Sequence, residues 1–340
     1  MILTFDIGGT NLRAGLYDIA TDRLVARDQC PAPSYLRYPG LNTKVLQEKL
    51  YAGMRALSHK IGLPRPKIIG VAFPGPIEQG IALQAPTLWG HGIVPQPVTL
   101  KLKKLWPEAH VGVFNDLTAA GFSFLQKPDE DMCIVTVSSG IGMKVFIDGK
   151  PALGPRCRGG EIGHWRVVWE KDAPICDCGG IGHLGAVASG RATPLQVKRL
   201  ISEDPSAYAA SVHGGKDPKQ LTNEEICRAF RDSDVWTRKL IKMMAQPLGR
   251  VLAAIHLSVG TERFLVMGGF ANALGQAYID LVKSEAEAVA WEPSGERRWA
   301  FELGMIGDDA GLLGSGRLVS RQFEVRQTNN GAKSRGDYAG

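Results

Sequence analysis

A unit of strand, polar glycine turn and strand occurs twice in this chain of 340 residues, and it limits the possible folds more than any other feature. The first copy covers residues 2–17 with its turn at 6–11, and the second covers residues 133–147 with its turn at 138–142. Each copy predicts an antiparallel pair of strands joined by a tight loop. Because the copies lie far apart and do not recur at a short period, they predict a duplicated domain and not a repeat array.

Buried strands alternate with helical patterns in the rest of the chain, which is typical of an α/β protein. Short apolar runs predict strands at 68–73, 111–114 and 264–267. Apolar residues at helical spacing predict helices at 42–61, 117–124, 184–201, 206–213, 222–231, 234–258, 272–290 and 309–320. Residues 325–340 are polar and rich in glycine, and we predict a disordered tail there.

The composition, 44% apolar and 22% charged residues, is typical of a soluble globular protein. No apolar run reaches about 18 residues and no signal sequence is recognisable, so we expect no membrane span and a cytoplasmic location. The net charge of +6 is mild and the basic residues form no block, which argues against a nucleic-acid partner. Without a secretory signal, the six cysteines do not predict a disulfide framework.

The two glycine turns contain the residue types of a phosphate site. Glycines let backbone N–H groups approach a phosphate with no Cβ in the way, a carboxylate can hold Mg²⁺ through water, and a hydroxyl can donate to a phosphate oxygen. An ordinary hairpin turn explains either copy alone, but two such turns facing each other could grip a polyphosphate from both sides. The candidate residues are Asp6, Gly8, Gly9, Thr10 and Asn11 in the first turn, and Ser139 and Gly140 in the second.

Two further pairs of residues each follow a buried strand. A carboxylate at Asp116, beside the amide of Asn115, can orient a substrate hydroxyl and remove its proton. Either residue can instead cap the helix that follows, and the two roles can hold together. Gly268 and Gly269 open a helix and let the backbone pass close to an adenine or a ribose, although simple packing of a helix on a strand also explains them.

A group of cysteines and histidines predicts a metal site in the second half of the chain. Cys176 and Cys178 are separated by one residue, with His164 before them and His183 after them. Two thiolates and two imidazoles suit tetrahedral Zn²⁺ with no open position, so the predicted site is structural and not catalytic. The alternative is two buried cysteines beside incidental histidines, but the close spacing around a glycine-rich turn favours zinc.

The order of these motifs along the chain resembles that of the ROK family of sugar kinases, within the actin-like ATPase superfamily. The resemblance covers about residues 2–320 and includes Pro74-Gly75-Pro76 and the segment from Glu161-x-Gly-His164 to Ser189-Gly190. It implies an α/β, two-domain actin-like ATPase (ribonuclease H-like) fold with a deep interdomain cleft. The implied domains are a small N-terminal α/β domain at 1–117, completed by a C-terminal helix at 309–322, and a large domain at 118–308 that contains the zinc segment.

The resemblance also implies an ATP-dependent kinase that phosphorylates a primary, 6-OH-like hydroxyl of a hexose or a hexose-like substrate. It implies ATP with Mg²⁺ at the two glycine turns, adenosine near Gly268 and Gly269, and a homo-oligomer such as a dimer. It further implies that His164 can serve both zinc and substrate through its two ring nitrogens. Asp116 becomes the catalytic base, and the substrate-binding residues are Gly75, Asn115, Asp116, Glu161 and His164.

Two residues depart from the pattern of this family. His183 stands where the family usually has a third cysteine, and it is still a competent zinc ligand. Gly185 stands where a glutamate usually accepts hydrogen bonds from ring hydroxyls, and losing such an acceptor typically costs about 1–3 kcal/mol. We therefore expect an amino sugar, a deoxy sugar or a cyclitol to be a better substrate than glucose.

Three alternatives stay open at this point. The first is a glucokinase that acts on glucose. The second is a non-catalytic, sugar-sensing ROK protein, which the presence of Asp6, Asn115 and Asp116 disfavours. The third is an actin-like or chaperone-like ATPase, which the zinc segment and the Glu161-x-Gly-His164 motif disfavour.

Overall fold

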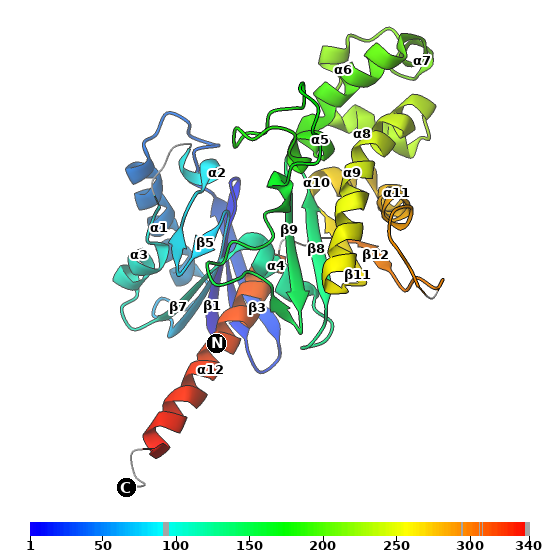
Figure 1. The fold of residues 1–340 in the computed structure, drawn as a ribbon. Helices are drawn as coiled ribbons and strands as arrows, with labels where there is room; N and C mark the ends of the chain where they lie inside the picture. Colours follow the sequence, from blue (N-terminus) through cyan, green and yellow to red (C-terminus); the bar gives the residue numbers. More distant parts are fainter. Residues whose placement is uncertain (91–94, 294, 306, 308, 337–340) are drawn as a thin grey trace. The chain divides into compact units, whose positions relative to one another are not determined.

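The computed structural model describes residues 1–90, 95–293, 295–305, 307 and 309–336, with side chains up to Phe323. The chain divides into two compact units, each with a five-stranded sheet and flanking helices, so the predicted α/β class is confirmed (Figure 1). The first unit comprises Met1–Gln126, Leu153–Arg158 and Gly307–Gly340, and the second comprises Lys127–Ala152 and Gly159–Ile306. The first unit thus extends past residue 117 and takes in a short segment from the middle of the chain.

The sheet of the first unit has the strand order β3-β2-β1-β4-β7. Strands β1 and β2 form the predicted antiparallel pair, β3 extends it to a meander, and β4 and β7 continue the sheet parallel to β1. Every residue of β4 is buried, as expected for a central strand covered on both faces. The bounds are Ile2–Ile7 for β1, Asn11–Asp18 for β2, Arg23–Pro31 for β3, Ile68–Phe73 for β4 and His110–Asn115 for β7.

The helices of the first unit start at sequence features that are easy to identify. Helix α1 (Thr43–Lys60) begins where the Asn42 side chain accepts a hydrogen bond from Val45 N at 3.0 Å, and it buries an apolar stripe that includes Leu46, Leu50 and Met54. The sequence patterns do not predict the short elements between β4 and β7. These are β5 (Ile77–Glu78), β6 (Ile81–Ala82), α2 (Pro86–Trp89) and α3 (Val98–Leu105).

Helix α12 (Ala310–Gly336) completes the first unit by packing on α4 (Asp116–Phe124), β1 and β4 (Figure 1). It is longer than the predicted helix at 309–322, so it enters the segment 325–340 for which the sequence predicts a disordered tail. The disorder of that tail stays a prediction, and residues 337–340 lie outside the described residues.

Close packing between α12 and α4 depends on glycine. A Cβ on Gly314 would lie 1.6 Å from the carbonyl oxygen of Ala119, which no repacking of side chains can relieve. We expect Gly314→Ala to lower the free energy of unfolding by about 1–3 kcal/mol, although alanine is the better helix former. Chemical denaturation measures this, and Gly40→Ala is the matched control because a Cβ at Gly40 would contact nothing within 4 Å. Equal stability of the two variants would contradict the packing argument.

The sheet of the second unit repeats the plan of the first, with the strand order β10-β9-β8-β11-β12. Three antiparallel strands are again followed by two strands that run parallel to the first of them. The repeated strand–turn–strand unit therefore heads the same kind of sheet in both units. The bounds are Met132–Val137 for β8, Ile141–Ile147 for β9, Lys150–Pro151 for β10, Arg263–Met267 for β11 and Ala300–Leu303 for β12.

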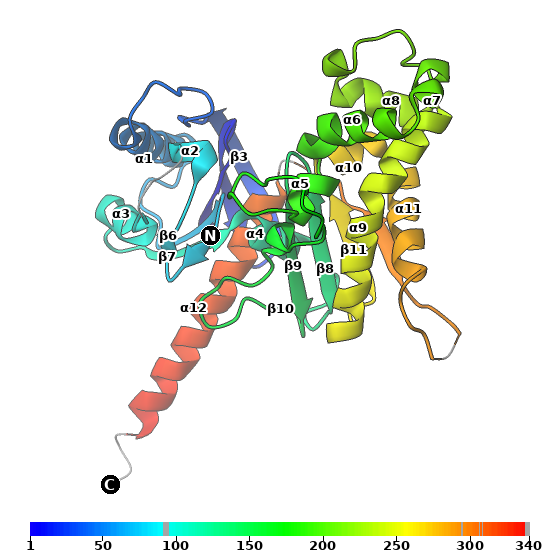
Figure 2. The same cartoon turned by 45° about the horizontal axis from the view of Figure 1, so that its top comes forward.

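Helices α9 (Val235–Val259) and α11 (Gln276–Glu287) run side by side in the second unit (Figure 2). With β8, β9 and β11 they enclose one apolar core. The remaining helices are α5 (Leu184–Ala188), α6 (Thr193–Glu203), α7 (Pro205–Ala210), α8 (Asn223–Arg231) and α10 (Gly269–Leu274), with 3₁₀ turns η1 (Ile162–His164), η2 (Gly190–Ala192) and η3 (Pro218–Gln220).

Two predicted helices are broken in the structure. The helix expected at 184–201 divides into α5, η2 and α6, because Ser189 is extended (φ −97°, ψ 167°) and Pro194 favours a new helix start. The helix expected at 272–290 divides at Gly275, whose φ of +79° belongs to the left-handed region that favours glycine. Among the described residues, no helix combines the length and the apolar character needed to cross a membrane.

Candidate active site

Three strands of the first unit end at one edge of its sheet. The parallel register places Asp6 of β1 beside Ala72 of β4, and Phe73 of β4 beside Asn115 of β7. The first glycine turn, the turn at Gly75 and the pair Asn115 and Asp116 therefore follow neighbouring strand ends, which is where ligands bind in α/β sheets. The structure brings these predicted residues of the first unit together.

The first glycine turn has two backbone N–H groups without a partner. Gly8 N donates to Asn11 O at 2.9 Å and closes the turn, while the carbonyls of Gly9 and Thr10 accept from Ser34 Oγ and Ala32 N. The N–H groups of Gly9 and Thr10 donate to no group among the described residues. Neither Gly8 nor Gly9 has a left-handed φ. Glycine suits these two positions because a Cβ would lie close to neighbouring atoms, and not because the backbone conformation is unusual.

Asp6 lies at the base of this turn and is largely buried. Arg13 Nη1 is 3.4 Å from Asp6 Oδ2, and both side chains are about four-fifths buried. Gly311 of α12 packs against the carboxylate, since a Cβ there would lie 2.7 Å from Asp6 Cγ. The carboxylate is therefore held in one place by packing and by an ion pair.

The second glycine turn repeats the arrangement of the first. Ser138 N donates to Gly140 O at 2.9 Å, and the carbonyl of Ser139 accepts from Ser189 Oγ at 3.0 Å. The N–H groups of Ser139 and Gly140 have no acceptor among the residues that the structure describes. In both turns, carbonyl groups accept hydrogen bonds from other parts of the same unit, whereas two adjacent N–H groups have no acceptor among the described residues. This is the backbone arrangement of an anion-binding nest.

Asn115 and Asp116 combine the two roles that the sequence leaves open. Asn115 Oδ1 caps α4 by accepting from Thr118 N at 3.1 Å, and Asn115 Nδ2 donates to Asp116 Oδ1 at 2.9 Å. Asp116 Oδ1 also accepts from Leu117 N at 2.8 Å. Two donors thus fix the orientation of the Asp116 carboxylate at the first turn of the helix, as a positioned general base requires.

Gly75 supports this arrangement through its backbone. Its φ is +122°, and a Cβ there would lie 2.2 Å from Gln84 O, so only glycine fits. Its carbonyl accepts from Asn115 Nδ2 at 3.1 Å. The structure therefore gives Gly75 a positioning role beside Asp116, whereas direct contact with a substrate stays a prediction.

In the second unit, Glu161 and His164 lie at the ends of the turn that contains η1. The Glu161 side chain is 46% exposed, and its Oε1 is 3.0 Å from Nζ of Lys144, which is 5% exposed. The His164 side chain is also exposed. Both predicted substrate-binding groups are therefore accessible, while Lys144 is a buried charge that the sequence analysis missed.

The four predicted metal ligands come together. One ligand atom from each of His164, Cys176, Cys178 and His183 can be chosen so that all four lie within 4.8 Å of one another. Cys176 Sγ is 3.8 Å from His164 Nδ1, and Cys178 Sγ is 3.3 Å from His183 Nδ1. Because His164 turns Nδ1 toward a thiol, its Nε2 is the nitrogen left for another ligand.

Local electrostatics suit these side chains to a soft divalent cation. Burial raises the pKa of the Cys176 thiol, and this effect outweighs the backbone N–H of Cys178, which lowers it. Burial lowers the pKa of His183, helped by the nearby charges of His164 and Arg166, so its imidazole is neutral near pH 7. The donor set of two sulfurs and two nitrogens fits a tetrahedral zinc site.

A pocket of about 400 Å³ lies beside the second glycine turn. Gly269 at the start of α10 lines it, and Gly268 has a φ of +104° with no room for a Cβ, which would lie 2.7 Å from Val137 O. The prediction from these two glycines missed the other walls, which come from distant parts of the chain. The pocket is lined by Ser138, Ser139, Gly190, Arg191, Asn223, Glu224, Cys227, Gly269, Phe270 and Ala273.

Arg191 adds a positive charge to this pocket. Its Nη2 would be 3.9 Å from a Cβ at Gly140, so the guanidinium lies next to the second glycine turn. It forms an ion pair with Asp177, which stands between two of the predicted metal ligands. A guanidinium beside free backbone N–H groups favours phosphate.

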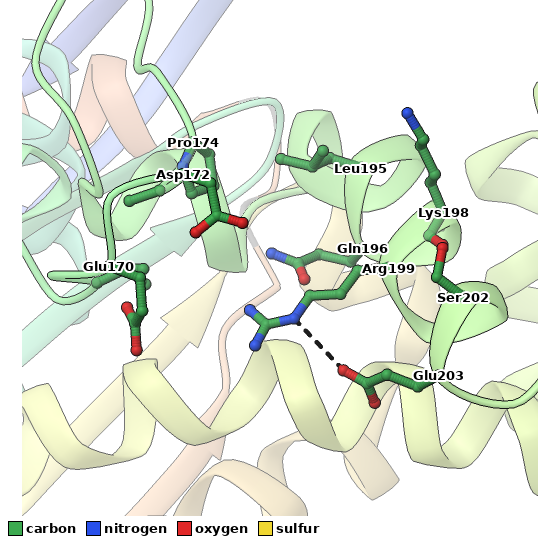
Figure 3. Close-up of a pocket in the computed structure, with 11 residues that line it drawn as sticks. Glu170, Asp172, Pro174, Leu195, Gln196, Lys198, Arg199, Ser202 and Glu203 are labelled. Carbon is green, nitrogen blue, oxygen red and sulfur yellow. Dashed lines mark hydrogen bonds and ion pairs between the residues drawn. The ribbon is translucent and has the colours of Figure 1, made fainter.

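A second pocket, of about 390 Å³, lies between α6 and the segment 170–174 (Figure 3). Arg199 Nε and Glu203 Oε1 pair there at 3.5 Å, so opposite charges compensate each other. None of the predicted site residues lines it. This pocket is therefore separate from the candidate site.

Gly185 is buried in α5, directly beside the turn that carries His164. A Cβ at Gly185 would lie 3.3 Å from Gly163 O, which is tighter than most side-chain contacts. Backbone thus fills much of the space beside this glycine. Ser189 Oγ donates to Gly185 O at 2.6 Å and to Ser139 O, so the end of α5 is also tied to the second glycine turn.

Comparisons with known proteins identify the family of this chain. A model of the ROK family matches residues 2–322. The C(7)-cyclitol 7-kinase of Streptomyces hygroscopicus subsp. jinggangensis is 35% identical over 335 residues, which cover 95% of this chain and 94% of that protein. The N-acetylmannosamine kinase of Salmonella arizonae is 27% identical over 319 residues, which cover 93% of this chain and 97% of that protein.

A solved structure confirms the predicted fold class. The ROK hexokinase from Thermus thermophilus superposes with a TM-score of 0.72 at 23% identity, over 95% of this chain and 99% of that one. At 23% identity this similarity establishes the fold, which is that of the actin-like ATPases, but not the substrate.

Proposed function

This chain belongs to the ROK family, and we propose that it is an ATP-dependent kinase that phosphorylates a hydroxyl group of a cyclitol or a sugar. The observation that carries the proposal is the pair of glycine turns, each with two adjacent N–H donors that have no partner among the described residues. Such donors, fixed before the substrate arrives, stabilise the charge that develops on phosphate oxygens during transfer.

The proposed chemistry is in-line transfer of the γ-phosphoryl group of ATP. Asp116 accepts the proton of the attacking hydroxyl, and Asn115 holds the carboxylate in position through the 2.9 Å hydrogen bond. Glu161 and His164 bind further hydroxyls of the substrate. The Asp6 carboxylate beside the first turn would hold the Mg²⁺ that accompanies ATP, and this ion would neutralise charge on the phosphates.

The nucleotide fits the pocket beside the second glycine turn. Gly268 and Gly269 allow close approach of the adenosine, and Phe270 offers an apolar wall. The N–H groups of Ser139 and Gly140, with the guanidinium of Arg191 next to them, face the phosphates.

A cyclitol is the substrate class that we favour. The relative with 35% identity is a C(7)-cyclitol 7-kinase, and the relative with 27% identity is a sugar kinase. Gly185 lacks the hydrogen-bond acceptor that ring hydroxyls of glucose would use, which points the same way. We further infer a structural zinc at His164, Cys176, Cys178 and His183, a cytoplasmic location and a homodimer.

A coupled assay of ADP release across cyclitols, hexoses and amino sugars tests the proposal. We expect the highest kcat/KM with a C7-cyclitol, and a higher value with glucose would overturn the substrate assignment. Release of ADP without any polyol would favour an ATPase. Binding of polyols without any ADP release would favour a non-catalytic sugar sensor.

A further inference from the structure

Lys144 occupies a position where a β-strand normally has an apolar side chain. It lies on β9 and pairs with Ile134 of β8, which is completely buried. Only 5% of its side chain is exposed. Burying an ammonium group costs several kcal/mol unless a partner compensates the charge, so the residue needs an explanation.

The partners of Lys144 all belong to the turn that leads into the substrate segment. Nζ donates to Gly159 O at 2.7 Å and to Glu161 Oε1 at 3.0 Å. Gly160 packs directly against the lysine side chain. Its φ is +88°, and a Cβ there would be 2.9 Å from Lys144 Cδ and 2.2 Å from Met143 O. The turn is thus closed onto the ammonium group, which fixes the direction of the Glu161 carboxylate.

The two oxygens of Glu161 have different surroundings. Oε1 accepts from the buried ammonium, whereas Oε2 has no hydrogen-bond partner among the described residues. The side chain is 46% exposed, so Oε2 is available to a substrate. The carboxylate therefore offers a hydrogen-bond acceptor whose negative charge Lys144 has already compensated.

We propose that Lys144 is a specificity-determining residue that makes this site select neutral polyols over substrates with a protonated amine. The inference rests on the proposed function, because it takes Glu161 as a substrate ligand. A hydroxyl can donate to Oε2 at no electrostatic cost. An ammonium group of a substrate at the same place would be attracted only weakly to the Glu161 carboxylate, because Lys144 already compensates its charge. It would also be repelled by Lys144 Nζ. Lys144 thus favours cyclitols over amino sugars with a protonated amine. Gly185 alone does not distinguish these two classes of substrate.

The test uses a C7-cyclitol and a series of analogues in which each ring hydroxyl in turn is replaced by an amine, at pH 7. For the wild type, we expect kcat/KM to fall at least about tenfold for the analogue whose amine meets Glu161. Lys144→Met should reduce this difference to about threefold or less through a lower KM for the amine, and Lys144→Arg should keep it. If Lys144 only supported the fold, its loss would lower kcat/KM equally for both substrates, which would overturn the proposal.

Lys150→Met is the matched control, because Lys150 lies on the next strand, is 78% exposed and pairs with Asp148 at the surface. Calorimetric binding of the same ligands to the zinc-loaded protein tests the role of Lys144 separately from the proposed kinase activity. If no ligand causes ADP release, the kinase proposal fails, and the binding preference still decides the role of Lys144. If Lys144→Met does not fold, equal wild-type affinity for the polyol and every amine analogue would itself overturn the inference.

Discussion

Replacing Asp116 with asparagine is expected to lower kcat by about 10²–10⁴-fold, with little change in the affinity for ATP or for the polyol. An amide cannot accept the proton of the attacking hydroxyl. It keeps the size of the side chain and the oxygen that accepts from Leu117 N at 2.8 Å, so the start of α4 should stay intact. The loss should therefore appear in the chemical step and not in binding or stability.

Single-turnover kinetics and calorimetric binding of a non-hydrolysable ATP analogue separate these quantities. Asp309→Asn is the matched control, because Asp309 belongs to the same unit and forms an exposed ion pair with Arg27 at 2.7 Å. This control should keep its kcat within a factor of about two, as expected for an exposed pair. Near-full turnover by Asp116→Asn would rule out Asp116 as the base.

Local sequence patterns predicted the parts of the site that a few consecutive residues build. The apolar runs before Asn115 and before Ser138 are strands because their length and continuous apolar character suit a buried sheet. The glycine turns follow from the same short segments. The cluster of cysteines and histidines was predicted for the same reason, since three of its four members lie within residues 176–183.

The parts that the sequence did not reveal are those that distant segments build. In the sequence, Lys144 is an ordinary polar residue of a strand. It is buried because the turn at Gly159 packs over it, and no local sequence pattern predicts this burial. Asn223 lines the pocket beside the second glycine turn and donates to Gly190 O at 2.8 Å across 33 positions. One signal was available for Arg191: it follows the Ser-Gly pair that breaks the predicted helix at 184–201, and such breaks often lie at functional sites.

Zinc removal is expected to have the largest effect on stability. The segment 165–182 contains little regular structure, so the proposed zinc would hold together a region that has no long helix or sheet of its own. Structural zinc sites contribute up to about 10–16 kcal/mol of apparent binding free energy at pH 7. We expect Cys176→Ser to abolish stoichiometric zinc and to lower Tm by about 10 °C or more.

Elemental analysis and thermal unfolding in the presence and absence of a chelator measure these two effects. Cys157→Ser is the control, because Cys157 is half-buried and outside the cluster. An unchanged zinc content in Cys176→Ser would remove Cys176 from the ligand set. Tm that does not respond to chelation would show that the metal has no structural role.

The pH dependence of zinc binding follows from the pKa shifts of the ligands. Burial raises the pKa of the Cys176 thiol in the metal-free protein, so this thiol is protonated at neutral pH and zinc must displace its proton. His183, whose pKa burial lowers, is already neutral there and releases no proton. Zinc affinity should therefore fall as the pH is lowered from 8 to 6, by about tenfold per pH unit for each proton displaced. Competition with a chromophoric chelator across this range measures the slope, and an affinity independent of pH would mean that the thiolates do not bind the metal.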